Sequence, residues 1–501
     1  MKKFAQILLI IAYFSIPMIG VYLFFVDGAI RFGETTLLGI ILGITSFTWL
    51  SFEFVLSARY RVLQRLFSSE KLYFFHALMA VIATFQAYLH HEGSEFEENE
   101  RVLAIGPFEF ELGTEGFGNL ALDIFVILIG LTIAFLVLLV LISYYNTLIN
   151  KYSDKKFVEI LQEKIFTYQF FKVTHNFLAI GMMVLLIHIL VVNLYKPSFL
   201  TLFYYYLIIW FIGFFSWIYP KFIRPILRLK NPYVVHKVIQ ENDSVVTIQL
   251  KPKKKKILNF NPGQYIFVGF KGWGWFREMH PFTISSSAEN KEYLSITIKN
   301  LGDYTRKIKN IKEGTIAHIE PPLGDFTYDK KSIGKDPLVF LAAGVGITPF
   351  MSMIRTLYDL EDSREIYLIW GNKTQQDKFF VEELKRISSE RPNFHVIHIL
   401  SRDEQWSGPK GRISKEVIEK TIQMHIIKKA HFFLCGPNSF INSIKKELRA
   451  LNIDKSHIHL EKFSFLSILE TIMFPIITLA EKLVQKIVVA IQERKNNKNS
   501  N

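Results

Sequence analysis

Two pairs of histidines inside long apolar segments constrain this chain more than any other feature. His76 and His90 lie 14 residues apart in one apolar run, and His175 and His188 lie 13 residues apart in another. Ionisable side chains are costly inside a bilayer and usually serve a function there. At a rise of 1.5 Å per residue, each pair spans roughly 20 Å, against a hydrocarbon core about 30 Å thick. The pattern predicts two facing helices that hold two stacked haems, one near each membrane face.

A single histidine on an apolar helix is more often a core residue than a ligand, but two matched pairs are hard to explain in that way. The 14-residue step keeps His76 and His90 on one helix face, because it is about 40° short of four turns. The 13-residue step of the second pair goes about 220° past three turns, so helix tilt, a local irregularity or ligation from different sides is required. His91 competes with His90 as a ligand, and we expect it to lie outside the ligand set.

Six apolar runs in the first 219 residues are long enough to span a bilayer. They cover residues 4–25, 35–57, 72–91, 121–148, 168–194 and 200–219. The first is too long for a signal peptide, and no small-residue cleavage site follows it, so we expect a membrane helix there. Basic residues collect after the second, fourth and sixth runs, which predicts cytoplasmic loops and termini, and the glutamate-rich loop 92–115 is expected outside. We therefore expect a multi-pass protein of the cell (plasma) membrane.

Charge and cysteine content exclude several other classes of protein. The net charge of +14 does not indicate nucleic acid binding, because much of it flanks the apolar runs or lies in Lys253–Lys256. That lysine run, between strand-like stretches at 245–250 and 264–268, predicts a solvated hairpin turn. Cys435 is the only cysteine, so neither an intrachain disulfide nor a cysteine-rich metal site is possible. A transporter is disfavoured because the charged residues of the apolar runs lie near helix ends: Glu53, Asp123 and Lys172.

The pattern changes after residue 233 to short β-branched runs. Residues 245–248, 265–268 and 294–298 predict strands of an antiparallel barrel. From about Pro337, strand-like and helical stretches alternate, in the order 338–342, 349–360, 366–370, 381–387, 395–400, 415–422 and 431–434. This alternation predicts a parallel sheet that binds its ligand at the carboxyl ends of the strands.

A glycine loop follows the first strand of this second region. Gly344 and Gly346 let backbone amides approach a pyrophosphate, and Pro349, after Thr348, suits the first turn of the next helix. Tight turns often need glycine for geometry alone. Here the position between a strand and a helix favours a nucleotide site.

Taken together, these residues resemble the NADPH oxidase and ferric reductase family, over roughly residues 35–465. In that family, six membrane helices with two b-type haems are fused to a ferredoxin-reductase-like flavin and nicotinamide module. The resemblance implies an all-α transmembrane domain at 1–220, a linker at 221–233, an FAD-binding antiparallel β-barrel at 234–330 and an α/β NAD(P)H-binding domain with a parallel sheet at 331–465. The chain continues beyond the resemblance, and the apolar and basic helical pattern of residues 466–501 predicts an amphipathic C-terminal extension. No calcium-binding EF-hand loop precedes the first helix, so we expect activity without calcium control.

The same resemblance implies the site residues. For the flavin they are His280, Pro281, Phe282 and Thr283, with Lys299, Gly302 and Thr305 at its pyrophosphate. For the nicotinamide nucleotide they are Gly344, Gly346, Thr348, Pro349, Gly436 and Pro437, with Cys435 beside the nicotinamide ring. Phe463 is expected to stack on the flavin. Two further stretches, Pro262–Tyr265 and Pro322–Phe326, look like the start of a flavin-domain strand and the turn that closes that domain.

This sequence departs from the family pattern after the strand that ends at Trp370-Gly371. Relatives that use NADPH often carry an arginine after that glycine, whereas here Asn372 and Lys373 follow it. Lys373 or Arg402 would have to hold the 2′-phosphate, so NADPH is only slightly favoured over NADH.

The expected activity is electron transfer from cytosolic NAD(P)H through FAD and the two haems to an acceptor outside. Molecular oxygen, giving superoxide, is the expected acceptor, and a ferric chelate is the alternative on the same path. A non-enzymatic haem-bearing subunit is disfavoured, because the glycine loop and the His280–Thr283 motif are intact. The extension 466–501 either lies on the membrane surface or packs on another subunit, and the oligomeric state stays open.

Overall fold

The computed structural model describes residues 2–28, 34–67, 69–93, 102–105, 108–111, 117–132, 173–195, 198–229, 231–254, 256–270, 279–301, 303–308, 310–330 and 332–461. The chain forms two compact units that divide between Ile223 and Arg224. The expected Phe463 and the extension 466–501 lie outside the described residues, as does Gly302.

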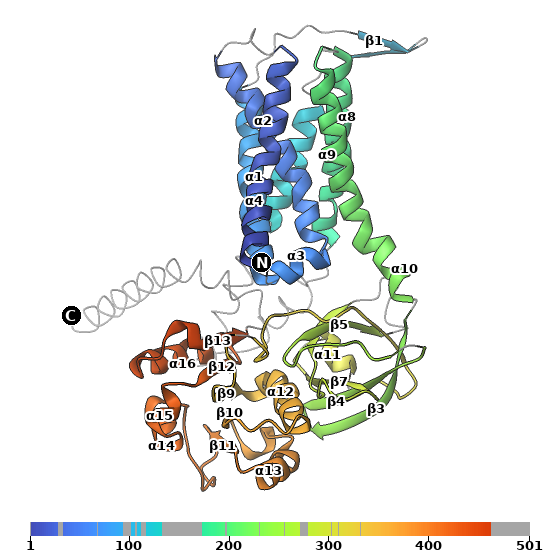
Figure 1. The fold of residues 1–501 in the computed structure, drawn as a ribbon. Helices are drawn as coiled ribbons and strands as arrows, with labels where there is room; N and C mark the ends of the chain where they lie inside the picture. The colour runs from blue at the N-terminus through green and yellow to red at the C-terminus, as the bar shows by residue number, and fades with distance from the viewer. Residues whose placement is uncertain are drawn as a thin grey trace, which may run out of the picture. The chain divides into compact units, whose positions relative to one another are not determined.

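The first unit is a bundle of long apolar helices (Figure 1). Among the described residues, five helices are long and apolar enough to cross a membrane: Lys3–Val26, Leu37–Ser57, Lys71–Glu92, Val173–Leu194 and Leu200–Leu229. A shorter apolar helix covers Phe117–Thr132, and the rest of the expected run 121–148 is not described. The element bounds are α1 Lys2–Val26, α2 Glu34–Ser57, α3 Arg61–Leu66, α4 Ser69–Gly93, α8 Leu178–Tyr195, α9 Leu200–Ile218 and the π-helical turn η3 Tyr219–Ile223.

Helix α2 lies at the centre of this bundle. Its membrane-length window is 56% buried, whereas the windows of the other four helices are 17–33% buried. Small residues bring the neighbours close: a Cβ on Gly213 of α9 would lie 2.9 Å from the Ser51 carbonyl oxygen. The hydroxyls of Thr48 and Tyr205 also pair at 2.8 Å between α2 and α9. Close approach at small residues and hydrogen bonds between helices are typical of packing in membranes.

The helix that carries the second histidine pair is interrupted at Phe177. Residues 173–176 are helical, Phe177 is a turn, and α8 begins at Leu178. The Phe177 amide donates to the Thr174 carbonyl at 3.0 Å, and the Ile180 amide donates to the Phe177 carbonyl at 2.8 Å. Such three-residue bonds advance the chain by about 120° per residue, against about 100° in an α-helix. The interruption therefore adds rotation where the 13-residue step falls short of four turns, and it reduces the mismatch between His175 and His188.

The glutamate-rich loop 92–115 contains a short hairpin that the sequence did not suggest. Strands β1 (Val102–Ile105) and β2 (Phe108–Glu111) pair antiparallel, with Leu103 opposite Phe110.

The second unit begins with helix α10 (Arg224–Leu229) and an antiparallel six-stranded sheet. The strand order is β6-β5-β8-β3-β4-β7. The end strands β6 and β7 meet at a single bridge between Ile284 and Ile296, so the expected barrel is antiparallel but is not closed by a continuous ladder. The strand bounds are β3 Tyr233–Asn242, β4 Val245–Pro252, β5 Tyr265–Phe270, β6 His280–Thr283, β7 Leu294–Lys299 and β8 Ile316–Ile319, with helix α11 at Asp303–Ile308.

The expected hairpin around Lys253–Lys256 is wrong. Strand β4, which precedes the lysines, pairs with β3 and β7, whereas β5, which follows them, pairs with β6 and β8. The lysines therefore lie in a connection between strands that are not neighbours. Strand spacing along the chain suggested a turn there, but pairing in this sheet follows a different order.

A five-stranded parallel sheet follows, as the strand–helix alternation predicted. Its order is β11-β10-β9-β12-β13. The central strand β9 has no solvent exposure from Leu338 to Ala342, as expected for a parallel sheet covered on both faces. The strands are β9 Leu338–Ala343, β10 Ile366–Asn372, β11 Phe394–Leu400, β12 His431–Cys435 and β13 Ile458–Glu461. The helices are α12 Thr348–Asp359, α13 Val381–Glu390, α14 Lys415–Thr421, α15 Met424–Ile427 and α16 Asn438–Ala450, with 3₁₀ turns η4 Gly344–Ile347, η5 Gln375–Asp377 and η6 Lys455–His457.

Candidate functional site

The strand order of the parallel sheet identifies where a nucleotide would bind. The chain builds the sheet outward from β9 to β11 and then crosses to the other side of β9 with β12. Ligands of such sheets bind outside the carboxyl ends of the strands, at the point where the order reverses. Here that point lies between β9 and β12, whose register sets Cys435 opposite Ala342. Gly344 follows β9 and Gly436 follows β12, so both expected loops start at this point.

The two loops contact each other through their backbones. A Cβ on Gly346 would lie 2.3 Å from the Cys435 carbonyl oxygen and 3.0 Å from the Gly436 amide nitrogen. Gly344 has a φ of +53°, which side chains rarely adopt. Trp370 donates its Nε1 hydrogen to the Gly344 carbonyl at 2.9 Å. Gly344 and Gly346 are thus required by a left-handed turn and by a close backbone approach.

Thr348 and Pro349 lie inside the protein at the start of α12. The Thr348 hydroxyl donates to the Val345 carbonyl at 3.1 Å, and Pro349 occupies the first turn of the helix, as expected. Both residues therefore fix the direction in which α12 leaves the glycine loop. Their contact with a nucleotide stays a prediction.

Cys435 is fully buried at the end of β12. Burial, and secondarily the charge of Glu461, raises the pKa of its thiol well above the usual value. The thiolate is the reactive form of cysteine, so this side chain is a neutral packing group rather than a nucleophile. Glu461 lies opposite Cys435 in the β12–β13 pairing and is the last described residue before Phe463.

The two cations expected at a 2′-phosphate lie on adjacent loops. The Arg402 amide donates to the Lys373 carbonyl at 2.8 Å, and the Ser401 amide donates to the Asn372 carbonyl at 3.0 Å. Both Lys373 and Arg402 are exposed. They follow the carboxyl ends of β10 and β11, at the same sheet edge as the glycine loop.

The two flavin motifs also come together. Tyr304 of α11 stacks on His280 of β6 with ring centres 3.6 Å apart and planes 23° apart. Phe282 lies 6.4 Å from the same ring, and the Leu301 amide donates to the Thr305 hydroxyl at 2.9 Å. Helix α11, which follows Lys299, is therefore held against the His280–Thr283 strand. Thr283 is buried and Pro281 is exposed.

Tyr304 was not assigned a role from the sequence, although it stands in the stretch that carries Lys299 and Thr305. An aromatic residue within a pyrophosphate-type motif is the signal that could have identified it. Its ring lies over the ring of His280 and covers one face of this imidazole.

The two remaining flavin-domain stretches contact each other as well. Gly263 has a φ of +94°, and a Cβ there would lie 2.1 Å from the Phe326 carbonyl oxygen. The Tyr265 amide donates to the Leu323 carbonyl at 3.0 Å, and Gln264 Nε2 donates to the Gly324 carbonyl at 3.0 Å. Residues 262–265 and 322–326 therefore form one turn-and-strand contact, consistent with their expected roles.

Helix α12 connects the flavin sheet to the glycine loop. Arg355 donates from Nη1 to the Ser285 carbonyl at 2.5 Å and from Nε and Nη2 to the Glu383 carboxylate at 2.7 and 2.5 Å. The Ser352 hydroxyl donates to the Ser286 carbonyl at 2.8 Å. Ser285 and Ser286 lie just beyond Thr283, and α12 begins at the glycine loop. The helix therefore fixes the spacing between the two expected nucleotide sites.

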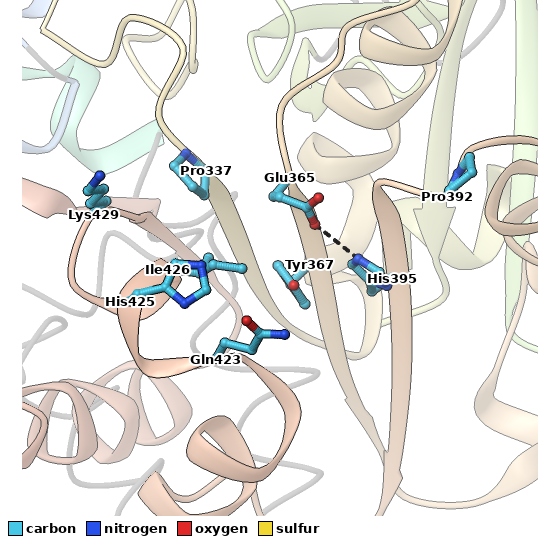
Figure 2. A pocket seen from close by; sticks show the side chains of 9 residues that line it. All are labelled: Pro337, Glu365, Tyr367, Pro392, His395, Gln423, His425, Ile426 and Lys429. Carbon is cyan, nitrogen blue, oxygen red and sulfur yellow. Dashed lines mark hydrogen bonds and ion pairs between the residues drawn. The ribbon is translucent and has the colours of Figure 1, made fainter.

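A pocket of about 530 Å³ lies at the other edge of the parallel sheet (Figure 2). Pro337 and Glu365 on its wall precede β9 and β10, so the pocket lies at the amino ends of the strands. Glu365 pairs with His395 at 3.0 Å within it. Because the expected nucleotide loops follow the carboxyl ends, this pocket is not part of the candidate site. Its lining residues are Pro337, Glu365, Tyr367, Pro392, His395, Gln423, His425, Ile426 and Lys429.

In the helical bundle, the rings of His76 on α4 and His175 lie side by side. The ring centres are 6.1 Å apart and the planes meet at 76°. With metal–nitrogen bonds of about 2 Å, two imidazoles on opposite sides of one metal ion have ring centres about 6 Å apart. Among the described residues, no group of three or more His, Cys, Asp or Glu side chains could hold a metal ion. A haem iron needs only two, so His76 and His175 are the residues that would hold one here.

Two of the three histidines of α4, His76 and His90, have partners on α2 at Nδ1. His76 Nδ1 lies 2.6 Å from Oε2 of Glu53, and His90 Nδ1 lies 2.9 Å from the Gly39 carbonyl oxygen. A histidine that binds a metal through one nitrogen commonly donates from the other to a carboxylate or a carbonyl. The arrangement favours the tautomer in which Nε2 is the ligand atom. Across the bundle, His175 Nδ1 lies 3.4 Å from the Thr132 hydroxyl.

The other two expected ligands pack against glycines. A Cβ on Gly43 would lie 2.8 Å from His90 Nδ1, and one on Gly118 would lie 3.0 Å from His188 Cε1. The pairing of His90 with His188 stays a prediction. His91 is exposed near the end of α4, and its exclusion from the ligand set stays a prediction.

Two family models match the second unit. An FAD-binding domain matches residues 231–322, and an oxidoreductase NAD-binding domain matches residues 340–446. Together they show that this region is an FAD- and NAD(P)H-dependent oxidoreductase module, as predicted. The helical bundle lies outside both matched ranges, so the haem assignment does not follow from them.

Similar curated proteins match a little under half of this chain. The chain is 29% identical over 234 residues to the glycine betaine monooxygenase reductase subunit of Chromohalobacter salexigens, covering 45% of this chain and 62% of that protein. It is 27% identical over 253 residues to flavohemoprotein A of Dictyostelium discoideum, covering 47% and 61%. The chain thus spans about three fifths of the length of these relatives. A solved FAD/NAD-binding domain of nitric oxide dioxygenase from Vibrio cholerae is 25% identical, covers 46% of this chain and 98% of its own, and has a TM-score of 0.42.

Proposed function

We propose that this protein carries electrons from NAD(P)H through FAD and two b-type haems across a membrane to molecular oxygen, giving superoxide on the far side. The observation that carries the proposal is the pairing of His76 with His175 at 6.1 Å inside an apolar bundle. The same chain continues into an FAD- and NAD(P)H-binding oxidoreductase module. A reductase module joined to a pair of half-buried imidazoles is a combination suited to electron transfer out of the module.

The residues of the module have separable roles in this proposal. Bound FAD would take two electrons as hydride from NAD(P)H and release them singly to haem iron, which accepts one at a time. Gly344 and Gly346 admit the pyrophosphate of the nucleotide to the backbone. Cys435 is buried and neutral, and it packs where the strand order of the parallel sheet reverses, between β9 and β12. Its thiol does not act as a nucleophile there. Tyr304 and His280 support the flavin ring.

The His76–His175 pair lies at the end of the bundle from which the chain continues into the module. Lys221, just beyond α9, donates to Asn176 at 2.6 Å, and Tyr60 donates to Ser216 at 3.1 Å near the end of α9. We therefore propose that this pair receives electrons first and that His90 and His188 receive them second. By the positive-inside rule, this end and the module are cytoplasmic.

NADPH is the proposed donor, with NADH as the alternative. Two exposed cations on adjacent loops, Lys373 and Arg402, give a 2′-phosphate charge-assisted partners. NADH lacks that phosphate and gains nothing from them.

The test uses the full chain reconstituted in sealed vesicles. Haem content should be two per chain, and NADPH added on the module side should drive superoxide dismutase-sensitive reduction of a reporter enclosed in the lumen. A colourless protein from cells supplied with haem would overturn the proposal, as would reduction confined to the side of NADPH addition.

A ferric chelate is the second candidate acceptor. The hairpin of the acidic loop includes Glu109 and Glu111 on β2, and carboxylates attract cations. If iron is the acceptor, reduction of a chelate enclosed in the lumen should proceed at an equal rate without oxygen, and added chelate should suppress the superoxide signal.

A further inference from the structure

One acidic side chain is buried in the middle of the helical bundle. Glu53 lies on α2 within the membrane-length segment Leu37–Ser57, and the residue is 6% exposed. A carboxyl group in such a segment is costly, and its presence points to a function with a nearby partner. Sequence analysis placed Glu53 near a helix end, and the structure shows that its carboxyl group has two partners.

Both oxygens of Glu53 are engaged. Oε2 lies 2.6 Å from His76 Nδ1, and the Tyr13 hydroxyl donates to Oε1 at 3.0 Å. Within the described residues, neither Oε2 nor Nδ1 makes a further hydrogen bond. Tyr13 is held in turn by Phe75 at 4.9 Å between ring centres and by Trp49, stacked at 6.3 Å. The carboxylate is therefore fixed in place and directed at one imidazole.

The equivalent contact of His90 on α4 is uncharged. His90 Nδ1 meets the Gly39 carbonyl oxygen at 2.9 Å, also on α2. A carboxylate partner makes a ligating imidazole more basic than a carbonyl partner does. It also adds a negative charge in a low-dielectric region, which stabilises the oxidised, more positive state of a bound iron. His76 and His90 are thus matched in position and differ in the charge of the acceptor.

We propose that Glu53 is a positioning residue for the haem iron bound at His76 and that it holds the reduction potential of this iron below that of the other haem. The inference rests on the proposed function, since it requires that haem is bound. The proposed difference in potential would set the direction of electron transfer between the haems. Electrons that enter at the His76–His175 pair reach a second haem that accepts them more readily, so outward transfer is downhill.

The experiment is a potentiometric titration of haem absorbance in the full-length protein, purified with both haems, for the wild type, Glu53→Gln, Tyr13→Phe and Thr48→Val. Glu53→Gln keeps the size of the side chain and removes its charge. One midpoint should rise by at least the equivalent of a tenfold change in the reduction equilibrium, about 59 mV for a one-electron couple, while the other stays fixed. Tyr13→Phe should lower the same midpoint by a smaller amount, because the carboxylate remains and loses the donor that draws charge away from His76.

Thr48→Val is the matched control. It removes a buried hydroxyl of the same helix, one that pairs with Tyr205. Both midpoints should stay at their wild-type values in this variant. A merely structural role of buried polar groups on α2 would instead shift potentials in Thr48→Val and Glu53→Gln alike.

The outcomes separate this inference from the proposed function. A wild-type protein without haem ends the proposed function and the inference with it. Two haems in Glu53→Gln with unchanged midpoints overturn the inference alone. Selective loss of one haem in Glu53→Gln, with both kept in Thr48→Val, supports the positioning role. If Glu53→Gln does not fold, Tyr13→Phe decides, and an unchanged midpoint in that variant overturns the inference.

Discussion

The oxidoreductase module and the helical bundle offer binding groups of opposite kinds. Where the strand order of the parallel sheet reverses, the two expected nucleotide loops approach closely because Gly346 has no side chain. A Cβ on Gly346 would lie 2.3 Å from the Cys435 carbonyl oxygen. In the bundle, the proposed ligands are side chains, with His76 and His175 side by side and partners behind their Nδ1 atoms. Nucleotide binding by the module should therefore be sensitive to substitutions that enlarge a glycine. Haem binding by the bundle should be sensitive to substitutions that remove a histidine side chain.

The largest expected effect comes from removing a ligand in the bundle. His76→Leu should abolish binding of at least one haem and lower NADPH-driven reduction of the enclosed acceptor by about 100-fold or more. Flavin-dependent reduction of a soluble dye by the module should be nearly unchanged, because the mutation leaves the second unit intact. Absorbance spectra and the two rates measure this.

The control is His91→Leu. His91 is an exposed histidine on the same helix, and its loss should leave the haem spectrum intact. A full two-haem spectrum in His76→Leu would show that His76 is not a ligand.

The next effect comes from adding one methyl group in the module. Gly346→Ala should force the backbone of the loop or of Cys435 to shift, at a cost of about 1–3 kcal/mol. We expect kcat/KM for NAD(P)H to fall about tenfold or more, with haem content unchanged. Gly371→Ala is the control, because its Cβ would lie 3.7 Å from the Ala342 carbonyl oxygen, an ordinary contact. Equal activity in the two variants would contradict the close-approach argument.

A smaller effect should separate the two nucleotides. Charge-assisted hydrogen bonds are worth about 1.5–3 kcal/mol, so Lys373→Gln combined with Arg402→Gln should lower the NADPH-to-NADH ratio of kcat/KM about tenfold or more. The rate with NADH should stay constant. Lys385→Gln removes an equal charge from α13, where Lys385 pairs with Glu382, and should leave the ratio unchanged. A ratio that survives the double substitution would remove these residues from the 2′-phosphate site.

The smallest effect concerns pH and one half-buried histidine of the module, His398. Burial, followed by the charges of Lys378 and Lys385, lowers the pKa of His398 to about 4. In the unfolded chain its pKa is about 6.5, so between these values the unfolded state binds more protons. The stabilisation is complete above about pH 6.5 and is lost as the pH falls toward about 4.

Flavin release on heating, followed between pH 7.5 and pH 5, measures this loss. His398→Gln should flatten the decline of the melting temperature with falling pH. His425→Gln, at an exposed position, should leave the decline as in the wild type. An identical pH slope in wild type and His398→Gln would rule out the effect.

Local patterns predicted much of the fold. The strand–helix alternation predicted β9 to β12 and their helices, because a buried parallel strand and an amphipathic helix each leave a local signature. The pairing of β4 was not predictable in the same way. Its pairing with β3 and β7 depends on packing over the whole sheet. The lysine run after β4 has the composition of a turn but does not form one between neighbouring strands.

The candidate site also has parts that were predictable from local sequence and parts that were not. The glycine loop was visible because strand, loop and helix are contiguous. Glu53 and His76 lie 23 residues apart on different helices, and Arg355 reaches Ser285 across 70 residues. No periodicity connects such partners, so the carboxylate behind a proposed ligand and the arginine between the two sheets emerge only from the tertiary structure.

The bonds made by α12 affect how the module can work. Swinging the parallel sheet away from the flavin sheet at this helix would break the bond from Arg355 to Ser285 and the bond from Ser352 to Ser286. A module tied in this way is expected to meet its dinucleotide with the distance between hydride donor and acceptor already set. Turnover would then be limited by arrival and departure of the nucleotide rather than by a clamping motion of the two halves.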